Sequence, residues 1–184
     1  MNEELIDVLS PDGTPTGVAK PKSALHRDGD WHLAVHVWIV TTDGQLLLQR
    51  RARVKDNHPD LWDVSCAGHV DAGETAIDAA LRETAEEIGI DLSADELIPF
   101  ATLRDQFVLH DGAYLDNEIL EVFIVRRDID PPALALQTSE VDEVKLVTVE
   151  EFRRLLAEDR TSFVPHYEEY EMILRELEFT NPQI

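Results

Sequence analysis

Three glutamates with helical spacing could together bind a metal ion. Glu83, Glu86 and Glu87 stand at positions i, i+3 and i+4, so on a helix their carboxylates converge. Three like charges this close destabilise an isolated helix unless a cation lies among them. Carboxylate oxygens suit hard ions such as Mg²⁺ or Mn²⁺, which also bind phosphate oxygens. For Glu-x-x-Glu-Glu alone, a solvated acidic face is the simpler alternative.

The flanking residues indicate how such a helix would be held. Its predicted span is 75–88, and Gly89 is a typical C-terminal stop. Gly68 lies six residues before Glu74, and Arg82 lies eight residues after Glu74. Side chains at spacings of three or four predict a stripe that faces the core, made of Ile77, Leu81, Thr84 and Ile88.

The segment 68–90 resembles the signature of the Nudix hydrolases. The match includes every charged and glycine position of that signature, namely Gly68, Glu74, Arg82, Glu83, Glu86, Glu87 and Gly89. So many fixed positions are more specific than a single short motif. Thr84 departs from the pattern, because the family usually has an aliphatic residue there, and little effect on catalysis is expected. The resemblance implies an α/β fold, the Nudix α/β/α sandwich with a mixed β-sheet.

The resemblance also implies roles for the glutamates and for the signature glycine. Glu83 and Glu87 would be the main ligands of Mg²⁺ or Mn²⁺. Glu86 would join them or orient a metal-bound water, and the carbonyl of Gly68 would complete the shell.

Basic residues are scarce in this chain, so those near the signature are informative. The resemblance implies that Arg82 forms an internal ion pair with Glu74, which braces the loop against the helix. A phosphate contact is the alternative for Arg82. Arg51 and Lys55 lie in a loop where the resemblance indicates phosphate binding, with ordinary surface charge as the alternative. His69 follows the signature glycine, and its predicted role is to orient the substrate.

The implied reaction is hydrolysis of a diphosphate linkage. Metal ions neutralise the diphosphate, lower the pKa of a bound water and align it for attack on phosphorus. A carboxylate then accepts the proton. Glu83 or Glu86 could do so, but a base outside the helix is also common in the family. Glu118 and Glu121 are the candidates on the strand expected over 113–126, with Glu118 preferred. The expected products are typically a nucleoside monophosphate and the phosphorylated remainder.

A second pattern lies outside the signature, in Trp31-His32-Leu33-Ala34, Arg50-Arg51, Leu61-Trp62, Gly68-His69 and Asn117-Glu118. It resembles the isopentenyl diphosphate isomerases, which share the fold but move a double bond. That resemblance implies a second group of metal-binding residues, made of His26 (one residue out of register), His32, His69, Asp116 and Glu118.

Two departures argue against isomerase activity. The isomerases have a catalytic cysteine directly before the signature glycine, whereas this chain has Ala67 there and Cys66 one position earlier. In an extended segment, a one-residue slip turns a side chain to the opposite face. Cys66 is therefore expected to be a small buried hydrophobe. The chain also keeps the full set of glutamates, for which an isomerase has no use.

The substrate and a possible loss of catalysis remain open at this level. A sensor that binds a nucleotide without cutting it is a third alternative, although such proteins tend to lose signature carboxylates and this chain keeps all of them. Four aromatic residues could stack on a base or belong to the core, namely Trp31, Trp62, Phe107 and Tyr114.

Composition limits the partners and the location. The formal net charge is −22, with 38 acidic against 16 basic residues, which disfavours a nucleic-acid polymer or an anionic membrane as partner. A small-molecule diphosphate is the expected partner, and a homodimer is expected by analogy alone. A single cysteine and an acidic N-terminus indicate a cytoplasmic protein. The length of 184 residues fits one domain spanning 1–184.

Strands interleaved with a few helices are predicted along the chain. An N-terminal hairpin is expected over 5–9 and 16–19, followed by a polar connection over 20–30. Further strands are expected over 33–41, 45–49, 62–66, 97–110, 113–126 and 141–147. Beyond the helix over 75–88, two C-terminal helices are expected, one over 148–157 and one over 164–177.

Overall fold

The computed structural model describes residues 3–180, which form one mixed sheet with helices on both faces. The strands are Leu5–Leu9 (β1), Pro15–Pro21 (β2), Trp31–Val40 (β3), Leu46–Arg51 (β4), Trp62–Asp63 (β5), Cys66–His69 (β6), Ile98–Leu109 (β7), Tyr114–Arg126 (β8) and Val141–Val147 (β9). The helices are Lys22–Asp28 (α1), Ala76–Ile88 (α2), Val149–Glu158 (α3) and Tyr167–Thr180 (α4). The predicted α/β class is confirmed.

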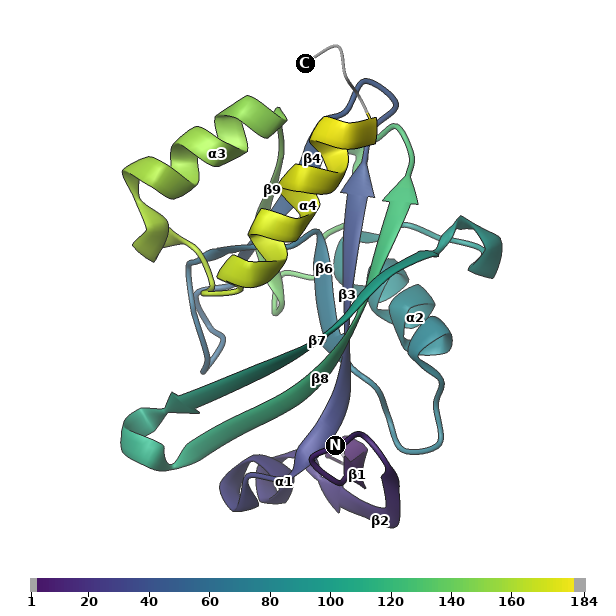
Figure 1. Cartoon of the computed structure of the whole chain (residues 1–184), viewed down its shortest axis with the longest axis vertical. Helices are drawn as coiled ribbons and strands as arrows, with labels where there is room; N and C mark the ends of the chain where they lie inside the picture. The colour runs from purple at the N-terminus through teal and green to yellow at the C-terminus, as the bar shows by residue number, and fades with distance from the viewer. Residues whose placement is uncertain (1–2, 181–184) are drawn as a thin grey trace.

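Strand β3 organises the sheet. It runs parallel to β8 over its whole length and antiparallel to β6. β4 pairs antiparallel with β9, and β7 pairs only with β8 among the described strands. The β7–β8 hairpin extends well beyond the body of the sheet, while β1, β2 and α1 lie near the N-terminal end of β3 (Figure 1). Because β3 carries neighbours of both directions, the sheet is mixed, as predicted.

Alternation along β3 divides the interior into two cores. Trp38 and Val40 pack in the core beneath α3 and α4, together with Phe152. Val37 and Ile39 point to the opposite face and pack against α2. Helices α3 and α4 therefore cover one face of the sheet and α2 covers the other (Figure 1). These layers are the expected α/β/α sandwich.

Helix α2 has defined caps at both ends. The Thr75 side chain accepts a hydrogen bond from the backbone N–H of Asp78, which fixes the start of the helix. Gly89 ends it with a φ of 71°, a left-handed conformation that glycine adopts without strain, and its N–H bonds to the carbonyl of Ala85. The predicted helix boundary is thus confirmed.

Some local predictions were wrong. The connection expected over 20–30 contains α1, and the strand expected over 62–66 is interrupted, so that β5 and β6 are separate. On α2, Ile77 is 40% exposed and does not join the core, whereas Thr84 and Ile88 are fully buried as predicted. Helix α4 begins at Tyr167, so Val164 precedes it. No helix within residues 3–180 is long and apolar enough to cross a membrane.

Candidate active site

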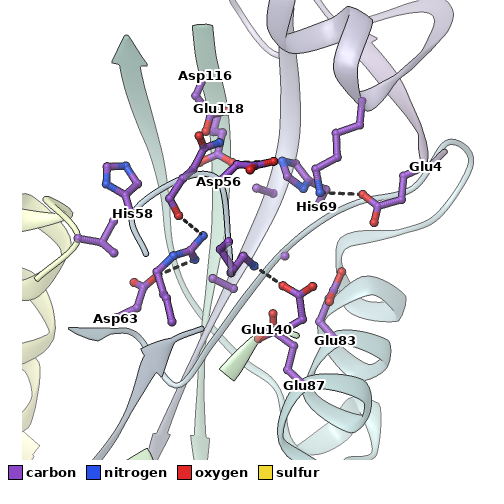
Figure 2. Close-up of a pocket in the computed structure, with 18 of the residues that line it drawn as sticks. Glu4, Asp56, His58, Asp63, His69, Glu83, Glu87, Asp116, Glu118 and Glu140 are labelled. Atoms are coloured by element: carbon purple, nitrogen blue, oxygen red, sulfur yellow. Dashed lines mark hydrogen bonds and ion pairs between the residues drawn. The ribbon is translucent and has the colours of Figure 1, made fainter. Parts of the chain in front are cut away.

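The glutamate helix borders a cavity of about 620 Å³. Its lining includes residues of α1, α2, most strands of the sheet, the loop after β4 and the segments before β9 and α4. Figure 2 shows Glu83, Glu87 and Glu140 on one side and His58 and Asp63 on the other. The sheet, α2 and the segment before α4 thus meet around one pocket.

Glu83 and Gly68 are in close contact. An added Cβ at Gly68 would lie 2.3 Å from Cδ of Glu83, so only glycine allows this approach. Glu87 lies one turn further along α2 and is 4% exposed. Glu86 projects outward with 56% of its side chain exposed, 3.7 Å from the guanidinium of Arg82. Glu83 and Glu87 therefore face the cavity, and Glu86 lies at its rim.

Electrostatics explain why this pair suits a cation. Burial, and after it the neighbouring carboxylate of Glu87, raises the pKa of Glu83 to about 7. Burial also raises the pKa of Glu87. Two buried carboxylates are costly when both are charged, and a divalent ion between them would offset that cost. The oxygen donors and the close approach allowed by Gly68 fit a hard divalent ion.

The ion pair predicted between Glu74 and Arg82 is formed. Arg82 donates from Nε to one carboxylate oxygen of Glu74 at 3.0 Å and from Nη2 to the other at 2.8 Å. The same guanidinium donates to the carbonyl of His69 at 3.1 Å and to Glu83 at 2.7 Å. Arg82 thus connects the loop before α2, strand β6 and the helix itself.

A histidine cluster lies on the same cavity. His26, His32, His69 and Asp116 each offer a ligand atom, and these atoms all lie within 4.8 Å of one another. Nε2 of His32 and Nε2 of His69 are buried without a hydrogen-bond partner in the described part of the chain. Burial lowers the pKa of His69 well below its usual value, so its ring is neutral and able to bind a metal. The residues that the isomerase resemblance indicated are therefore brought together.

The two glutamates proposed as bases on β8 have different surroundings. Glu118 lines the cavity, with Oε1 3.7 Å from Nε2 of His32 and 3.8 Å from Nε2 of His69. Glu121 lies three residues further on, accepts a hydrogen bond from Thr102 and is not among the lining residues. An odd separation along a strand places side chains on opposite faces. The preference for Glu118 over Glu121 therefore agrees with the geometry.

The basic loop residues reach the cavity but have acidic partners. Arg51 donates to Asp63 and to the carbonyl of Asn57, both at 3.2 Å. Lys55 forms an ion pair with Glu140. Both line the cavity, so both remain candidates for phosphate binding once these partners are exchanged.

Cys66 and Ala67 point to opposite sides of β6. Cys66 is fully buried in the core beneath α2, whereas Ala67 lines the cavity. Burial raises the pKa of the Cys66 thiol well above its usual value, which removes the reactive thiolate. Since Cys66 is the chain's single cysteine, the cavity contains no thiol within the described residues.

Several lining residues were not foreseen. Asp63, His58 and His166 line the cavity, and so do two of the four aromatic candidates, Phe107 and Tyr114. A lone aspartate in a short strand and a histidine just before the last helix gave no pattern in the sequence. Trp31 and Trp62 lie elsewhere, each under a cationic side chain.

The fold and the site define an α/β protein with a carboxylate-rich, metal-compatible cavity at one end of a mixed sheet. A model of the NUDIX domain matches residues 30–167. The chain belongs to the Nudix hydrolase family, whose members cleave pyrophosphate bonds in nucleoside diphosphate derivatives and generally use divalent ions such as Mg²⁺. The predicted resemblance is thus confirmed.

Relatives are found in both groups that the sequence resembled. The chain is 44% identical over 169 residues to Nudix hydrolase 3 of Arabidopsis thaliana, covering 90% of this chain but only 22% of that protein. It is 33% identical over 126 residues to an isopentenyl-diphosphate Delta-isomerase of Escherichia coli, covering 68% of each. A solved structure from Deinococcus radiodurans matches with a TM-score of 0.66 and 22% identity, covering 94% of this chain and 98% of that chain.

Proposed function

We propose that this protein is a divalent-metal-dependent hydrolase that cleaves the diphosphate linkage of a nucleoside diphosphate derivative. The observation that carries the proposal is the pair of buried carboxylates, Glu83 and Glu87, facing a cavity beside Gly68. Mg²⁺ or Mn²⁺ held by this pair and by the Gly68 carbonyl would neutralise the phosphates and supply an activated water. Glu86, at the rim, would join the ligands.

The remaining roles belong to side chains of the chain itself. Glu118 accepts the proton of the attacking water, because its carboxylate faces the cavity from β8 opposite the helix. Arg51 and Lys55 contact phosphate oxygens, and His69 orients the substrate. Arg82 and Glu74 hold the loop that carries Gly68 against α2. Small nucleotide ligands fit this proposal, since a Nudix domain of Shewanella oneidensis with TM-score 0.59 was solved with ADP ribose.

Isomerisation of isopentenyl diphosphate is the second candidate, and the histidine cluster favours it. A second divalent ion fits the cluster of His26, His32, His69 and Asp116. Nε2 of His32 and Nε2 of His69 are buried and have no hydrogen-bond partner within residues 3–180, so a metal ion would satisfy them. Against isomerisation, Cys66 lies in the core and Ala67 occupies the cavity wall. We therefore assign the histidine cluster to a second ion of the hydrolase. A cytoplasmic location and a homodimer stay predictions.

The test compares Glu87→Gln with the wild type and with the exposed control Glu150→Gln. A panel of nucleoside diphosphate derivatives and isopentenyl diphosphate is incubated with Mg²⁺ or Mn²⁺, and products are identified by phosphate analysis and proton NMR. Wild type and control should release monophosphates, while Glu87→Gln should stay folded by circular dichroism and release none. Full activity in Glu87→Gln would refute the site. Bond migration without cleavage would favour the isomerase, and binding without turnover would favour a sensor.

A further inference from the structure

The cavity wall facing the glutamate helix is polar and buried, yet the proposed hydrolysis does not use it. Asp63, His36 and His166 line the cavity and are 1%, 3% and 6% exposed. In Figure 2, Asp63 and His58 lie across the pocket from Glu83 and Glu87. Burying polar groups is costly unless each finds a hydrogen-bond partner. The hydrogen bonds that these wall residues make, and those they lack, therefore indicate which ligand group the cavity would bind.

His166 is held in a fixed orientation beside Asp63. Its Nδ1 lies 2.5 Å from a carboxylate oxygen of Asp105, which directs the other ring nitrogen away from Asp105. That nitrogen, Nε2, lies 3.7 Å from Oδ1 of Asp63, which is too long for a direct hydrogen bond. A single oxygen atom beside this gap could lie within hydrogen-bond distance of both atoms. A hydroxyl suits the position, because it both donates and accepts.

The surroundings of Asp63 favour its ionised carboxylate, which accepts hydrogen bonds. Its Oδ2 accepts from Arg51 at 3.2 Å, and its Oδ1 accepts from the backbone N–H of Val64 at 2.8 Å. Burial opposes its ionisation, but His166, Arg51 and His36 together keep the pKa of Asp63 below its usual value. An ionised carboxylate that is shielded from solvent accepts a strong hydrogen bond from a ligand hydroxyl.

Among the neighbouring side chains, His36 has a hydrogen-bond partner, and Phe107 and His58 contribute rings. Nδ1 of His36 bonds to Glu169 at 2.8 Å, and Trp38 donates to the same carboxylate at 2.6 Å. The ring of Phe107 stands edge to face with His58 at 5.4 Å and with His166 at 5.7 Å. Such rings can cover the C–H faces of a bound carbon skeleton. An apolar chain would instead leave the Asp63–His166 pair dehydrated and unmatched.

We propose that Asp63 and His166 bind a hydroxyl group on the substituent that the diphosphate carries, so that the enzyme selects hydroxylated, sugar-like diphosphates over isoprenoid ones. The hydroxyl donates to Oδ1 of Asp63 and accepts from the N–H at Nε2 of His166, whose N–H at Nδ1 donates to Asp105. This inference rests on the hydrolase function proposed above and adds the chemical class of the group beyond the phosphates.

Two five-carbon probes test the proposal: ribose 5-diphosphate, which carries hydroxyls, and isopentenyl diphosphate, which carries none. Binding in Mg²⁺ is measured by calorimetry on full chains that all carry Glu118→Gln, because loss of the proposed base keeps the probes from being cleaved during the titration. The chain in which Asp63 and His166 are intact, called wild type here, should bind the ribose compound at least about tenfold more tightly, because the other probe leaves buried polar groups unpaired. His166→Phe should remove most of this preference, and the exposed control Asp91→Asn should keep it.

The ratio of the two affinities separates recognition from general damage. A variant that only loosens the cavity weakens both probes alike, whereas loss of the hydroxyl contact weakens the ribose compound alone. Asp63→Asn provides a second variant should His166→Phe fail to fold. Equal affinity of wild type for both probes, including no binding of either, would overturn the proposal, as would an unchanged preference in both folded variants.

Hydrolysis is scored separately from binding, so that the two proposals fail in different ways. If both probes bind with equal affinity and are cleaved, the hydroxyl contact is contradicted and the hydrolase function is supported. If the ribose compound binds much more tightly but no diphosphate is cleaved in Mg²⁺ or Mn²⁺, the hydrolase function is contradicted and the hydroxyl contact is supported.

Discussion

Gly68→Ala is the substitution that most directly tests the geometry of the glutamate site. An alanine Cβ at this position would lie 2.3 Å from Cδ of Glu83 and 2.5 Å from its Cγ and Oε1. Side chains do not tolerate such contacts, so Glu83 must move. Its carboxylate would then leave both the Gly68 backbone and the hydrogen bond from Arg82, which measures 2.7 Å.

The magnitude follows from the cost of overpacking a well-filled site. Adding one methyl group where none fits costs about 1–3 kcal/mol of unfolding free energy. The effect on catalysis should be larger, because displacing a reacting group by about 1 Å can cost about 100-fold in rate. Gly68→Ala should therefore stay folded, lose most Mg²⁺-dependent hydrolysis and bind Mg²⁺ more weakly by calorimetry.

A double-mutant cycle with Glu83→Ala isolates the contact. In that background the clashing atoms are absent, so Gly68→Ala should cost clearly less in urea unfolding than it does in the wild type. The expected coupling is on the order of 1 kcal/mol. Glu150→Ala, exposed on α3, is the control and should be additive with Gly68→Ala. Equal costs of Gly68→Ala with and without Glu83 would refute the reasoning.

Three further predictions concern charge and packing at the same site. Without metal, the unfolding free energy should fall as pH rises from about 4.5 to about 7. The folded protein keeps the Glu83 proton up to its pKa of about 7, whereas the unfolded chain releases it near the ordinary pKa of 4.5. Urea titrations with and without Mg²⁺ should diverge across this window, and parallel curves would contradict the prediction. Arg82→Lys should lower the unfolding free energy by about 1 kcal/mol, because lysine cannot bond both oxygens of Glu74; an unchanged melting temperature would argue against bracing. Cys66→Ala should lower the unfolding free energy by about 1 kcal/mol and leave kcat/KM for hydrolysis unchanged. Loss of activity in a folded variant would instead favour a catalytic role for Cys66, as the isomerase alternative requires.

Most elements were predictable because their signals are local. The limits of α2 follow from Thr75 and Gly89, whose cap bonds involve only the adjacent turn. The boundaries of β9 were predicted residue for residue, since it contains three valines, which favour strands, and ends at the helix-capping Thr148. Helix α1 was missed because it is a seven-residue helix with no side-chain N-cap and only two buried side chains, Leu25 and His26. Tertiary contacts, which a single sequence does not display, decide such a helix.

The glutamate side of the pocket was predictable and the opposite wall was not. Glu83 and Glu87 lie one turn apart on one helix, so helical periodicity brings them together beside Gly68, whereas Glu86, which was expected to converge with them, lies at the rim. The Asp63–His166 pair joins β5 to the segment before α4, and the two residues are 103 positions apart in the sequence. Nothing local marks such a pairing. Ile77 was misplaced for a related reason, since the buried side of α2 is set by Ala79 and Ala80 against the sheet.

The pairing of basic residues around the cavity bears on how so acidic a chain would bind the proposed diphosphate substrate. Arg82 is engaged by Glu74 and Glu83, and Lys55 and Arg51 each have a carboxylate partner. Guanidinium and ammonium groups that are already neutralised attract a phosphate weakly, and the net charge of −22 repels it. In the proposed hydrolase, attraction would then come from divalent ions held by the carboxylates, which would invert the local field. The same carboxylates that repel the substrate without metal would therefore make its binding conditional on metal.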